Sequence, residues 1–569
     1  MASLMWTLTH GEYQKGFVHR APSLCLRFMP TLPTGVLMLS TIRLLVFLLI
    51  VIAAVAFLAA RLQIPLAILL VLTGFAMAFV PGLPRIELAP EFVLLLVLPP
   101  IIYSSAVAMS WREFHFNLRP ISLLAIGCVT FTMIAVAAAT HWLLGFAWPV
   151  GFTLGAIVSP PDPVAPLAIA RRMQLPRRLA VILEGEGLAN DATALILYRF
   201  AIAAVSASTF SLGRAVGMFA AILACEFLWG IGAAWVMLRL RRWVGDTRIE
   251  ITLSILTPFL AYWPPEYLGG SGVLATVTAG LYISWNGLRL ISAATRLQGV
   301  FFWEFLVYLI EGMVFLITGL QARTLIFGIR DYSIFDLAIS VTLVSTVVIV
   351  ARFAWMYPAT YIPRWLIPAV RRKDPSPPWQ WPTALAFTGV RGIVSLVAAL
   401  GIPFTTDNGE PFPQRDLILF LTFSVILVTL VGQGLMLPTV IRWLGLAHAG
   451  RRERHADREE EFAARRQAIE AAIERLGQLA SERQLSDDIV RPLRAHYRDR
   501  LKNVEHPGDR GRRKLAELND EIEFQLIEAE RLAINDRYRR GQLKDEARRR
   551  VERELDLRDA LLTHLRPKE

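Results

Sequence analysis

Apolar runs of about 20 residues recur from residue 41 to residue 446, and they constrain the fold more than any other feature of this sequence. A helix needs about 20 apolar residues to cross a hydrocarbon core that is ~30 Å thick. Hydrophobic residues make up 54% of the chain. A soluble helical protein of this length would interrupt its apolar stretches far more often, so the pattern predicts an all-α integral membrane protein.

We predict about 13 transmembrane helices in a membrane domain over residues 41–446, with spans at 41–60, 63–80, 91–108, 118–144, 149–170, 179–205, 212–238, 249–264, 271–286, 299–322, 334–360, 382–402 and 415–446. Basic residues divide unevenly between alternate loops. The poorer set of loops holds only Arg85, Arg214, Arg323, Arg330 and Arg415. Short cytoplasmic loops collect Lys and Arg, so the richer set is assigned to the cytoplasm. The protein is then a multi-pass protein of the plasma (inner) membrane, with its N-terminus outside and its C-terminal tail in the cytoplasm.

The two ends of the chain differ from the membrane domain. Residues 1–40 are an N-terminal extension of mixed composition without a clean signal peptide, and Met29 or Met38 are alternative starts. We assign this extension no function. Residues 447–569 are rich in Arg and Glu and carry apolar residues at helical spacing. They predict a cytoplasmic helical tail, which serves either as a small bundle or oligomerisation element or as a regulatory domain.

The net charge of +12 could indicate a nucleic-acid-binding protein. Its placement argues against nucleic acid as a partner, because Lys and Arg cluster between the apolar runs and in the tail. The three cysteines are widely spaced and form neither a metal-binding pattern nor a disulfide framework. No cofactor is expected, and the sequence contains no Walker-type phosphate loop.

The fifth span contains Ser159-Pro160-Pro161-Asp162-Pro163. Proline lacks a backbone N–H and clashes with the preceding helical turn, so this span is expected to break at Asp162. Transporters use the free backbone groups of broken helices to hold ions near the membrane midplane. The alternative is a simple proline kink with an Asp that faces a water pocket.

The sixth span contains Glu184-Gly185-Glu186-Gly187-Leu188-Ala189-Asn190-Asp191. Glu184 and Asp191 share one helix face, and Glu186 and Asn190 share a neighbouring face. In the twelfth span Arg391 lies between two glycines, in Gly389-Val390-Arg391-Gly392. Counted from the predicted span ends, Asp162, Asp191 and Arg391 reach similar depths near the middle of the membrane.

An ionisable residue inside a membrane is costly and is a functional candidate by default. A buried Arg needs a carboxylate, and we predict Glu186 as the structural partner of Arg391. Asp162 and Asp191 then remain to bind a monovalent cation or a proton. A carboxylate in a partly dehydrated pocket holds a proton more tightly than in water, and a bound cation displaces that proton. If the protein reorients only when this site is occupied, the result is exchange.

The sequence resembles the monovalent cation:proton antiporter-1 family, in its bacterial branch. The residues that carry the resemblance are Leu98-Pro99-Pro100-Ile101-Ile102-Tyr103, Asp162-Pro163-Val164-Ala165, Glu186 through Asp191, and Gly389 through Gly392. The resemblance implies two inverted six-helix repeats, with spans 5 and 12 as crossed, broken helices. It also implies a homodimer with an elevator-like movement of a core bundle.

The resemblance further implies that Asp191 is the carboxylate that binds the ion and exchanges the proton. Asn190 stands where electrogenic relatives carry a second Asp, so one-for-one electroneutral exchange is implied. Asp162 takes the broken-helix position, and Glu186 with Arg391 the structural ion pair. The implied function is a bacterial Na⁺/H⁺ antiporter that regulates cytoplasmic pH and cation content in contact with membrane lipid.

Two positions depart from the family pattern. Pro161 replaces a Thr and Gly187 replaces a Ser, so two hydroxyl groups that could bind an ion are missing. Ser159, Thr193, backbone carbonyls or water could substitute, and K⁺ or Li⁺ stays open beside Na⁺. Glu304 and Glu311 share one face of the tenth span. They are either accessory acids of the ion path, together with Glu184, or they serve interhelical hydrogen bonding or a dimer surface.

Other classes of function are less consistent with these residues. A passive cation channel would also need buried acids, but it has no obligatory proton counterflow. An intramembrane enzyme is disfavoured because the sequence lacks a His-Glu-x-x-His motif and a Ser-His pair at membrane depth. A transporter-like sensor that signals through the tail is a third alternative.

Overall fold

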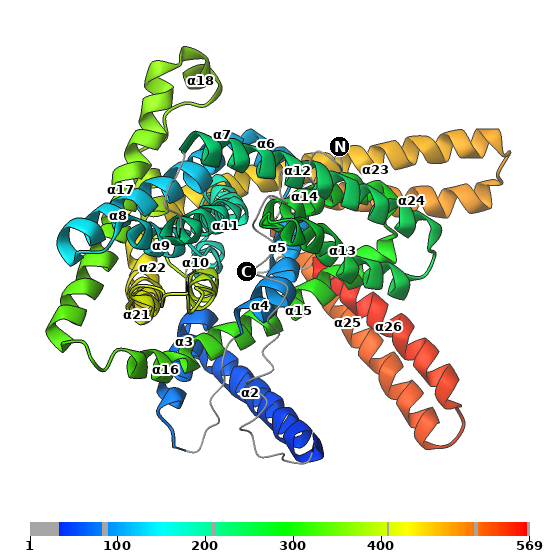
Figure 1. The fold of residues 1–569 in the computed structure, drawn as a ribbon. Helices are drawn as coiled ribbons and strands as arrows, with labels where there is room; N and C mark the ends of the chain where they lie inside the picture. Colours follow the sequence, from blue (N-terminus) through cyan, green and yellow to red (C-terminus); the bar gives the residue numbers. More distant parts are fainter. Residues whose placement is uncertain (1–33, 82–88, 207–211, 407–408, 506–509, 566–569) are drawn as a thin grey trace. The chain divides into compact units, whose positions relative to one another are not determined.

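The computed structural model describes residues 34–81, 89–206, 212–406, 409–505 and 510–565 (Figure 1). The predicted N-terminal extension therefore lies outside the described residues as far as residue 33. The described part of the chain is helical, and its one isolated β-bridge joins Thr405 to Pro411. The expected all-α fold is confirmed.

The first half of the membrane domain contains α2 Thr34–Leu62, α3 Leu66–Ala78, α4 Pro90–Phe92, η1 Val93–Val97, α5 Leu98–Ala108, α6 Trp111–Phe116, α7 Leu118–Ser122, η2 Leu123–Cys128, α8 Val129–Leu144, α9 Trp148–Val158, α10 Val164–Arg172, α11 Arg177–Ser206 and α12 Leu212–Trp243. The second half contains α13 Thr247–Tyr267, α14 Val273–Leu290, α15 Ala293–Leu320, α16 Ala322–Gly328, α17 Ile334–Leu366, α18 Pro368–Lys373, α19 Gln380–Phe387, α20 Ile393–Leu400, α21 Arg415–Leu427, η3 Val428–Gln433 and α22 Gly434–Trp443. The elements η1, η2 and η3 are short π-helical segments inside longer helices.

Within the described residues, 8 helices are long and apolar enough to cross a membrane, and two shorter apolar helices cover Leu66–Ala78 and Trp148–Val158. Each predicted span contains at least one observed helix. The fifth and twelfth spans are broken into half-helices, so neither half is long enough to be counted as a span. The chain is a multi-pass membrane protein, and the count of thirteen spans stays a prediction.

Close helix packing in the membrane domain depends on small residues. The helices α3 and α15 meet at Gly74 and Gly319, where an added Cβ on either residue would collide with the backbone of the other helix. On α9, Gly155 lies in the same way against the backbone of Met133 on α8. Water does not drive helices together within lipid, so such close backbone contact provides much of the packing.

Two groups of helices are visible in the membrane domain (Figure 1). In one group α9 packs against α8, α11 and α20, and α17 packs against α8 and α19. In the other, α14 packs against α5 and α12, while α3 packs against α15. The broken helices both belong to the first group, so the candidate site is built inside one bundle.

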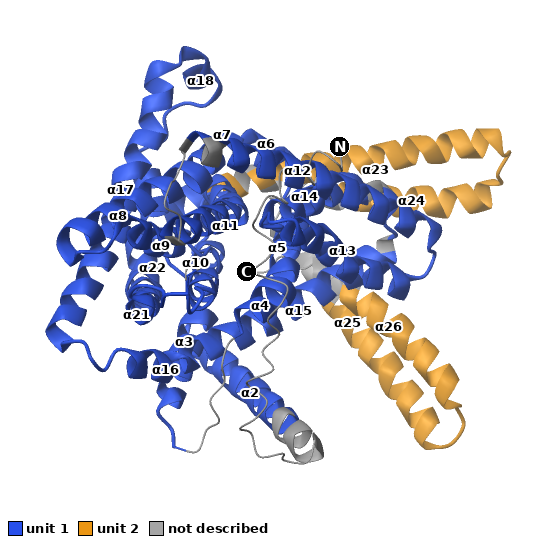
Figure 2. Cartoon of the chain, viewed as in Figure 1, with its two compact units in different colours: residues 1–451 blue, residues 452–569 orange. Residues whose placement is uncertain are grey.

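The chain divides into two compact units, residues 1–451 and 452–569 (Figure 2). The second unit comprises most of α23 Leu446–Glu482, followed by α24 Asp487–Glu505, α25 Arg510–Arg539 and α26 Asp545–Leu565. Ile527 on α25 and Leu555 on α26 are buried, and Arg531 on α25 forms ion pairs with Asp556 and Asp559 on α26. The tail is therefore helical, as predicted, and α25 and α26 pack against each other through buried apolar residues and ion pairs.

Candidate functional site

The two broken helices cross at their interruptions. Helix α9 ends at Val158 and α10 begins at Val164, while α19 ends at Phe387 and α20 begins at Ile393. The backbone N–H of Asp162 donates to the carbonyl of Val390 over 2.7 Å, which joins the two breaks directly. The predicted pair of crossed, broken helices is confirmed in the described structure.

The Asp162 carboxylate lies at the start of two half-helices. Its Oδ1 accepts a hydrogen bond of 2.9 Å from the N–H of Val164, the first residue of α10. It also lies against Gly392, directly before α20, where an added Cβ would collide with Oδ2. Helix N-termini carry partial positive charge, so both half-helices stabilise the negative charge of Asp162. Only glycine at position 392 leaves room for this arrangement.

Arg391 lies at the other side of the crossing, where the half-helices α9 and α19 end. Its Nε donates to the carbonyl of Val158 over 2.8 Å, and its Nη2 to the carbonyl of Ser159 over 3.3 Å. A third bond runs from Nη1 to the carbonyl of Gly389. These carbonyls lie where α9 and α19 end and lack their usual helical donors. Arg391 therefore stabilises the negative ends of the half-helices, and it is not an ion-pair partner of Glu186.

Glu186 pairs with Arg352, so the predicted Glu186–Arg391 ion pair is wrong. Nη1 of Arg352 lies 2.5 Å from Oε1 of Glu186, and Nη2 lies 2.9 Å from Oε2. Arg352 also donates to the carbonyl of Leu385 on α19 from Nε and Nη2. Both side chains are almost fully buried, at 1% and 2% exposure. A planar guanidinium on α17 matches the carboxylate in two parallel bonds, while the donors of Arg391 are taken by carbonyls.

Sequence reasoning missed Arg352, although a signal was present. It is a single Arg inside the apolar span predicted at 334–360, and any charge within a span is a functional candidate. Its partner lies 166 positions earlier in the chain, so spacing alone could not reveal the pair.

Asn190 and Asp191 lie beside the crossing and have acceptor atoms without hydrogen-bond partners among the described residues. Nδ2 of Asn190 donates to the carbonyl of Pro161 over 2.7 Å, whereas its buried Oδ1 has no hydrogen-bond partner. Asp191 is half-buried, and no described residue donates a hydrogen bond or forms an ion pair to its carboxylate. Its charge and that of Asp162 act on each other. Asp162, Asn190 and Asp191 are thus brought together, with free oxygen atoms among them.

The hydroxyl groups expected to assist this site are near it in the chain and are buried. Oγ of Ser159 donates to the carbonyl of Ala156 over 3.1 Å, and Oγ1 of Thr193 to the carbonyl of Ala189 over 3.3 Å. Both oxygens keep lone pairs. A Cβ at Gly187 would collide with the ring of Pro163, so a hydroxyl side chain at position 187 requires these two segments to move apart.

The accessory acids have different surroundings. Glu184 forms an ion pair of 2.6 Å with Arg171. On α15, Glu304 is exposed and has no ion-pair or hydrogen-bond partner among the described residues, while Glu311 is half-buried and its charge acts on Asp162. Glu226, a further buried acid on α12, accepts bonds from the N–H groups of Ser271 and Leu274 around the start of α14. Glu226 therefore serves interhelical hydrogen bonding.

Comparison with known proteins identifies the family. The profile of the family described as "Sodium/hydrogen exchanger, transmembrane" matches residues 45–443. The chain belongs to this family of transport proteins, which confirms the resemblance found in the sequence.

Similar proteins come from several bacteria and an archaeon. An uncharacterized Na⁺/H⁺ exchanger of Mycobacterium tuberculosis is 33% identical over 506 residues, which cover 87% of this chain and 91% of that protein. The sodium, potassium, lithium and rubidium/H⁺ antiporter of Bacillus subtilis is 30% identical over 85% of this chain and 72% of its own length. The fold matches the sodium proton antiporter MjNhaP1 from Methanocaldococcus jannaschii, with a TM-score of 0.57 and 18% identity over 72% of this chain and 98% of that one.

Proposed function

We propose that this protein is a secondary antiporter that exchanges Na⁺ for H⁺. The observation that carries the proposal is the contrast at the crossing, where Glu186, Arg352 and Arg391 are fully partnered while Asp191 and Oδ1 of Asn190 are not. The names of the similar proteins, all Na⁺/H⁺ exchangers or cation/H⁺ antiporters, support the same activity.

Competition for one site produces the exchange. Asp162 and Asp191 repel each other when both are ionised, and either a proton or a cation relieves this repulsion. A hard monovalent cation would take carboxylate oxygens from Asp191 and Asp162 and the free Oδ1 of Asn190, completed by Ser159, Thr193 or water. Because Asn190 is neutral, one cation replaces one proton and the cycle is electroneutral. Glu311 serves as an accessory acid, since its charge acts on Asp162.

Na⁺ is the favoured cation, and K⁺ or Li⁺ is the alternative. The absence of hydroxyl groups at Pro161 and Gly187 removes two possible side-chain ligands, which keeps K⁺ and Li⁺ open beside Na⁺. The Bacillus subtilis relative is named for sodium, potassium, lithium and rubidium, which supports testing all of these ions.

Access to the site would come from the side rich in Lys and Arg. A cavity of about 730 Å³ is lined by residues of α2, α3, α10 and α22 and of the turn between α2 and α3, including Gln63, Arg172 and Arg442. Arg172 ends the half-helix α10, whose first residue binds Asp162. The cavity would thus open toward the cytoplasm in an inner-membrane protein with its tail inside. A homodimer in contact with lipid completes the proposal.

The test is exchange in proteoliposomes that contain a pH-sensitive dye. A pH gradient is imposed, and Na⁺, Li⁺ or K⁺ is added outside to vesicles with the wild type, Asp191→Asn or Glu304→Gln. Collapse of the gradient by cation in the wild type and in Glu304→Gln, but not in Asp191→Asn, supports the antiporter. Cation flux without proton counterflow would instead establish a channel.

A further inference from the structure

Three arginine side chains converge on one carboxylate away from the helix crossing. Arg119 on α7 and Arg364 on α17 contact Oδ2 of Asp374 at 2.6 Å and 2.7 Å, and Arg178 on α11 contacts Oδ1 at 2.9 Å. We call Arg119, Arg178, Arg364 and Asp374 the arginine cluster. Its members come from three helices and the segment after α18. They are distant in the sequence and meet only in the folded protein.

The arginine cluster carries excess positive charge. Burial raises the pKa of Asp374, but the hydrogen bond from Arg178 and the charges of Arg178, Arg364 and Arg119 outweigh it and leave this pKa below its ordinary value. Asp374 is therefore ionised near neutral pH and offsets only one of three guanidinium charges. An unbalanced, partly buried group of cations favours a further anion.

The donors of the three arginines are not equally occupied. Arg364 also donates to the carbonyls of Thr360 and Asp374, and Arg178 also donates from Nε to Oδ1 of Asn117. Arg119 is 28% exposed, and Asp374 is its one acceptor among the described residues. The guanidinium of Arg119 is thus the group with donors to spare for a ligand.

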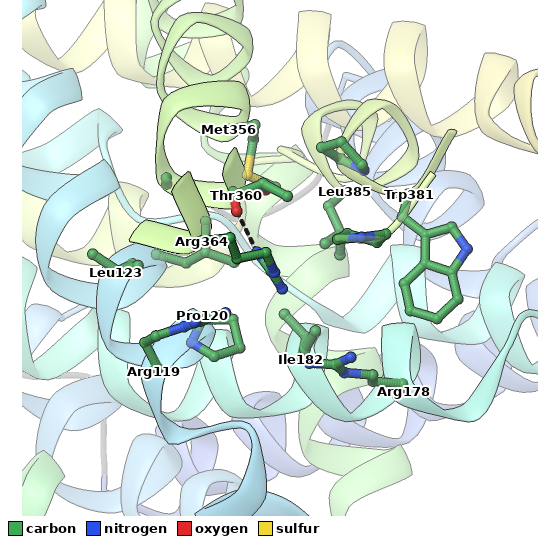
Figure 3. A pocket seen from close by; sticks show the side chains of 14 residues that line it. Arg119, Pro120, Leu123, Arg178, Ile182, Met356, Thr360, Arg364, Trp381 and Leu385 are labelled. Atoms are coloured by element: carbon green, nitrogen blue, oxygen red, sulfur yellow. Dashed lines mark hydrogen bonds between the residues drawn. The ribbon is translucent and has the colours of Figure 1, made fainter. Parts of the chain in front are cut away.

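A cavity of about 40 Å³ lies beside these donors (Figure 3). That volume holds roughly three water molecules. The space is comparable to the volume that the oxygen atoms of one phosphate group occupy. Arg119, Arg178 and Arg364 line the cavity together with apolar side chains, among them Leu123, Ile182, Met356, Trp381 and Leu385. A ligand with a charged group and an apolar body fits this lining better than a small ion does.

The surroundings of the arginine cluster resemble the interface of a membrane. Trp365, next to Arg364, is 81% exposed, and Trp379 is 50% exposed. Exposed tryptophans mark the level of lipid headgroups. The basic residues Arg371, Arg372 and Lys373 directly precede Asp374 and are exposed. Anionic lipids bind in basic pockets between transmembrane helices on the cytoplasmic side.

We propose that this cavity binds the phosphate group of an anionic phospholipid. The phosphate lies between Arg119 and Arg178, where guanidinium groups offer paired donors that match phosphate oxygens. The glycerol and the first part of an acyl chain lie against Leu123 and Trp381. The apolar lining and the exposed tryptophans favour a lipid over free phosphate, although both would use the same donors.

The test is native mass spectrometry of the full-length protein in detergent with equal amounts of phosphatidylglycerol and phosphatidylethanolamine. The wild type is expected to retain phosphatidylglycerol preferentially. Arg119→Gln should reduce this binding roughly fivefold, and Arg119→Lys should lose less. Arg242→Gln, the same change at an exposed residue in the last turn of α12, is the matched control and should bind like the wild type.

Further arms separate the possible outcomes. Asp374→Asn removes the internal anion and should strengthen lipid binding, a gain that misfolding cannot produce. Competition by inorganic phosphate without any preference for phosphatidylglycerol would overturn the lipid as ligand. Equal losses in Arg119→Gln and Arg242→Gln would overturn the site itself, because they would indicate general charge attraction. The readout is lipid binding, so it does not depend on whether the protein exchanges Na⁺ for H⁺.

Discussion

Two groups of charged and polar residues lie close together in the membrane domain, yet they are built differently. The scaffold charges, Glu186, Arg352 and Arg391, direct their donors and acceptors at one another or at backbone carbonyls. The proposed exchange site, Asp162, Asn190 and Asp191, keeps acceptor atoms to which no described residue donates a hydrogen bond. The scaffold charges are almost fully buried and satisfied, whereas Asp162 and Asp191 are half-buried and part of their site is unsatisfied.

The difference separates structural charges from those available to a ligand. A buried charge costs several kcal/mol to desolvate. It is stable only where counter-charges or hydrogen bonds offset that cost. The scaffold charges have these partners within the protein. The carboxylate of Asp191 has none among the described residues, so in the proposed cycle a proton or a cation from solution supplies the missing positive charge.

The variant Asp191→Asn tests this difference between the two groups most directly. The change removes the unpaired carboxylate but keeps the shape of the side chain. We expect proton-coupled cation flux in proteoliposomes to fall to the level of protein-free vesicles, while the thermal unfolding midpoint in detergent stays near that of the wild type. Flux that persisted in this variant would mean that Asp191 is not the exchanging group.

Glu186→Gln should have the largest effect on stability. It leaves the Arg352 guanidinium buried without its counter-charge, which costs roughly 3–5 kcal/mol. Thermal unfolding of the purified protein measures the loss. The double variant Glu186→Leu with Arg352→Met removes both charges and should be markedly more stable than the single variant. Equal losses in the two proteins would contradict the assignment of Arg352 as partner.

A smaller effect on stability is expected from Asn190→Asp. An ionised Asp cannot donate to the carbonyl of Pro161, and an unsatisfied buried acceptor costs roughly 1–3 kcal/mol. The same unfolding assay should show this loss at pH 8, and acidification should reduce it, because a protonated Asp regains a donor. A loss of stability that did not depend on pH would show that the missing hydrogen bond to the carbonyl of Pro161 is not its cause.

The smallest effects distinguish the two acids of α15. Glu304 is exposed and without partners in the described structure, so Glu304→Gln should leave the exchange rate close to that of the wild type. Glu311 is half-buried and its charge acts on Asp162, so Glu311→Gln should lower the rate severalfold and shift its dependence on pH. Comparing initial rates over a pH series tests this, and equal behaviour of both variants would exclude Glu311 from the ion path.

Much of the exchange site could be predicted because its signals are local. Three prolines around Asp162 predict a broken helix by themselves, and the glycines on both sides of Arg391 predict the second break. The register of one helix places Asp191 and Asn190 at similar depth. The partner of Glu186 could not be predicted in the same way, because Arg352 and Arg391 are both buried arginines in apolar spans.

The arginine cluster lay beyond sequence reasoning for the same reason. Arg119 on α7 and Asp374 after α18 are 255 positions apart. Nothing in their spacing marks them as partners.

The sequence alone determined the membrane class, the helical fold, the two breaks and the acids that lie beside them. These follow from the lengths of apolar runs and from the backbone chemistry of proline and glycine, which act over a few residues. Only the tertiary structure decided which arginine meets Glu186, which carbonyls Arg391 binds and where the arginine cluster forms. Ion pairing depends on distances between helices that are remote in sequence, and packing sets those distances.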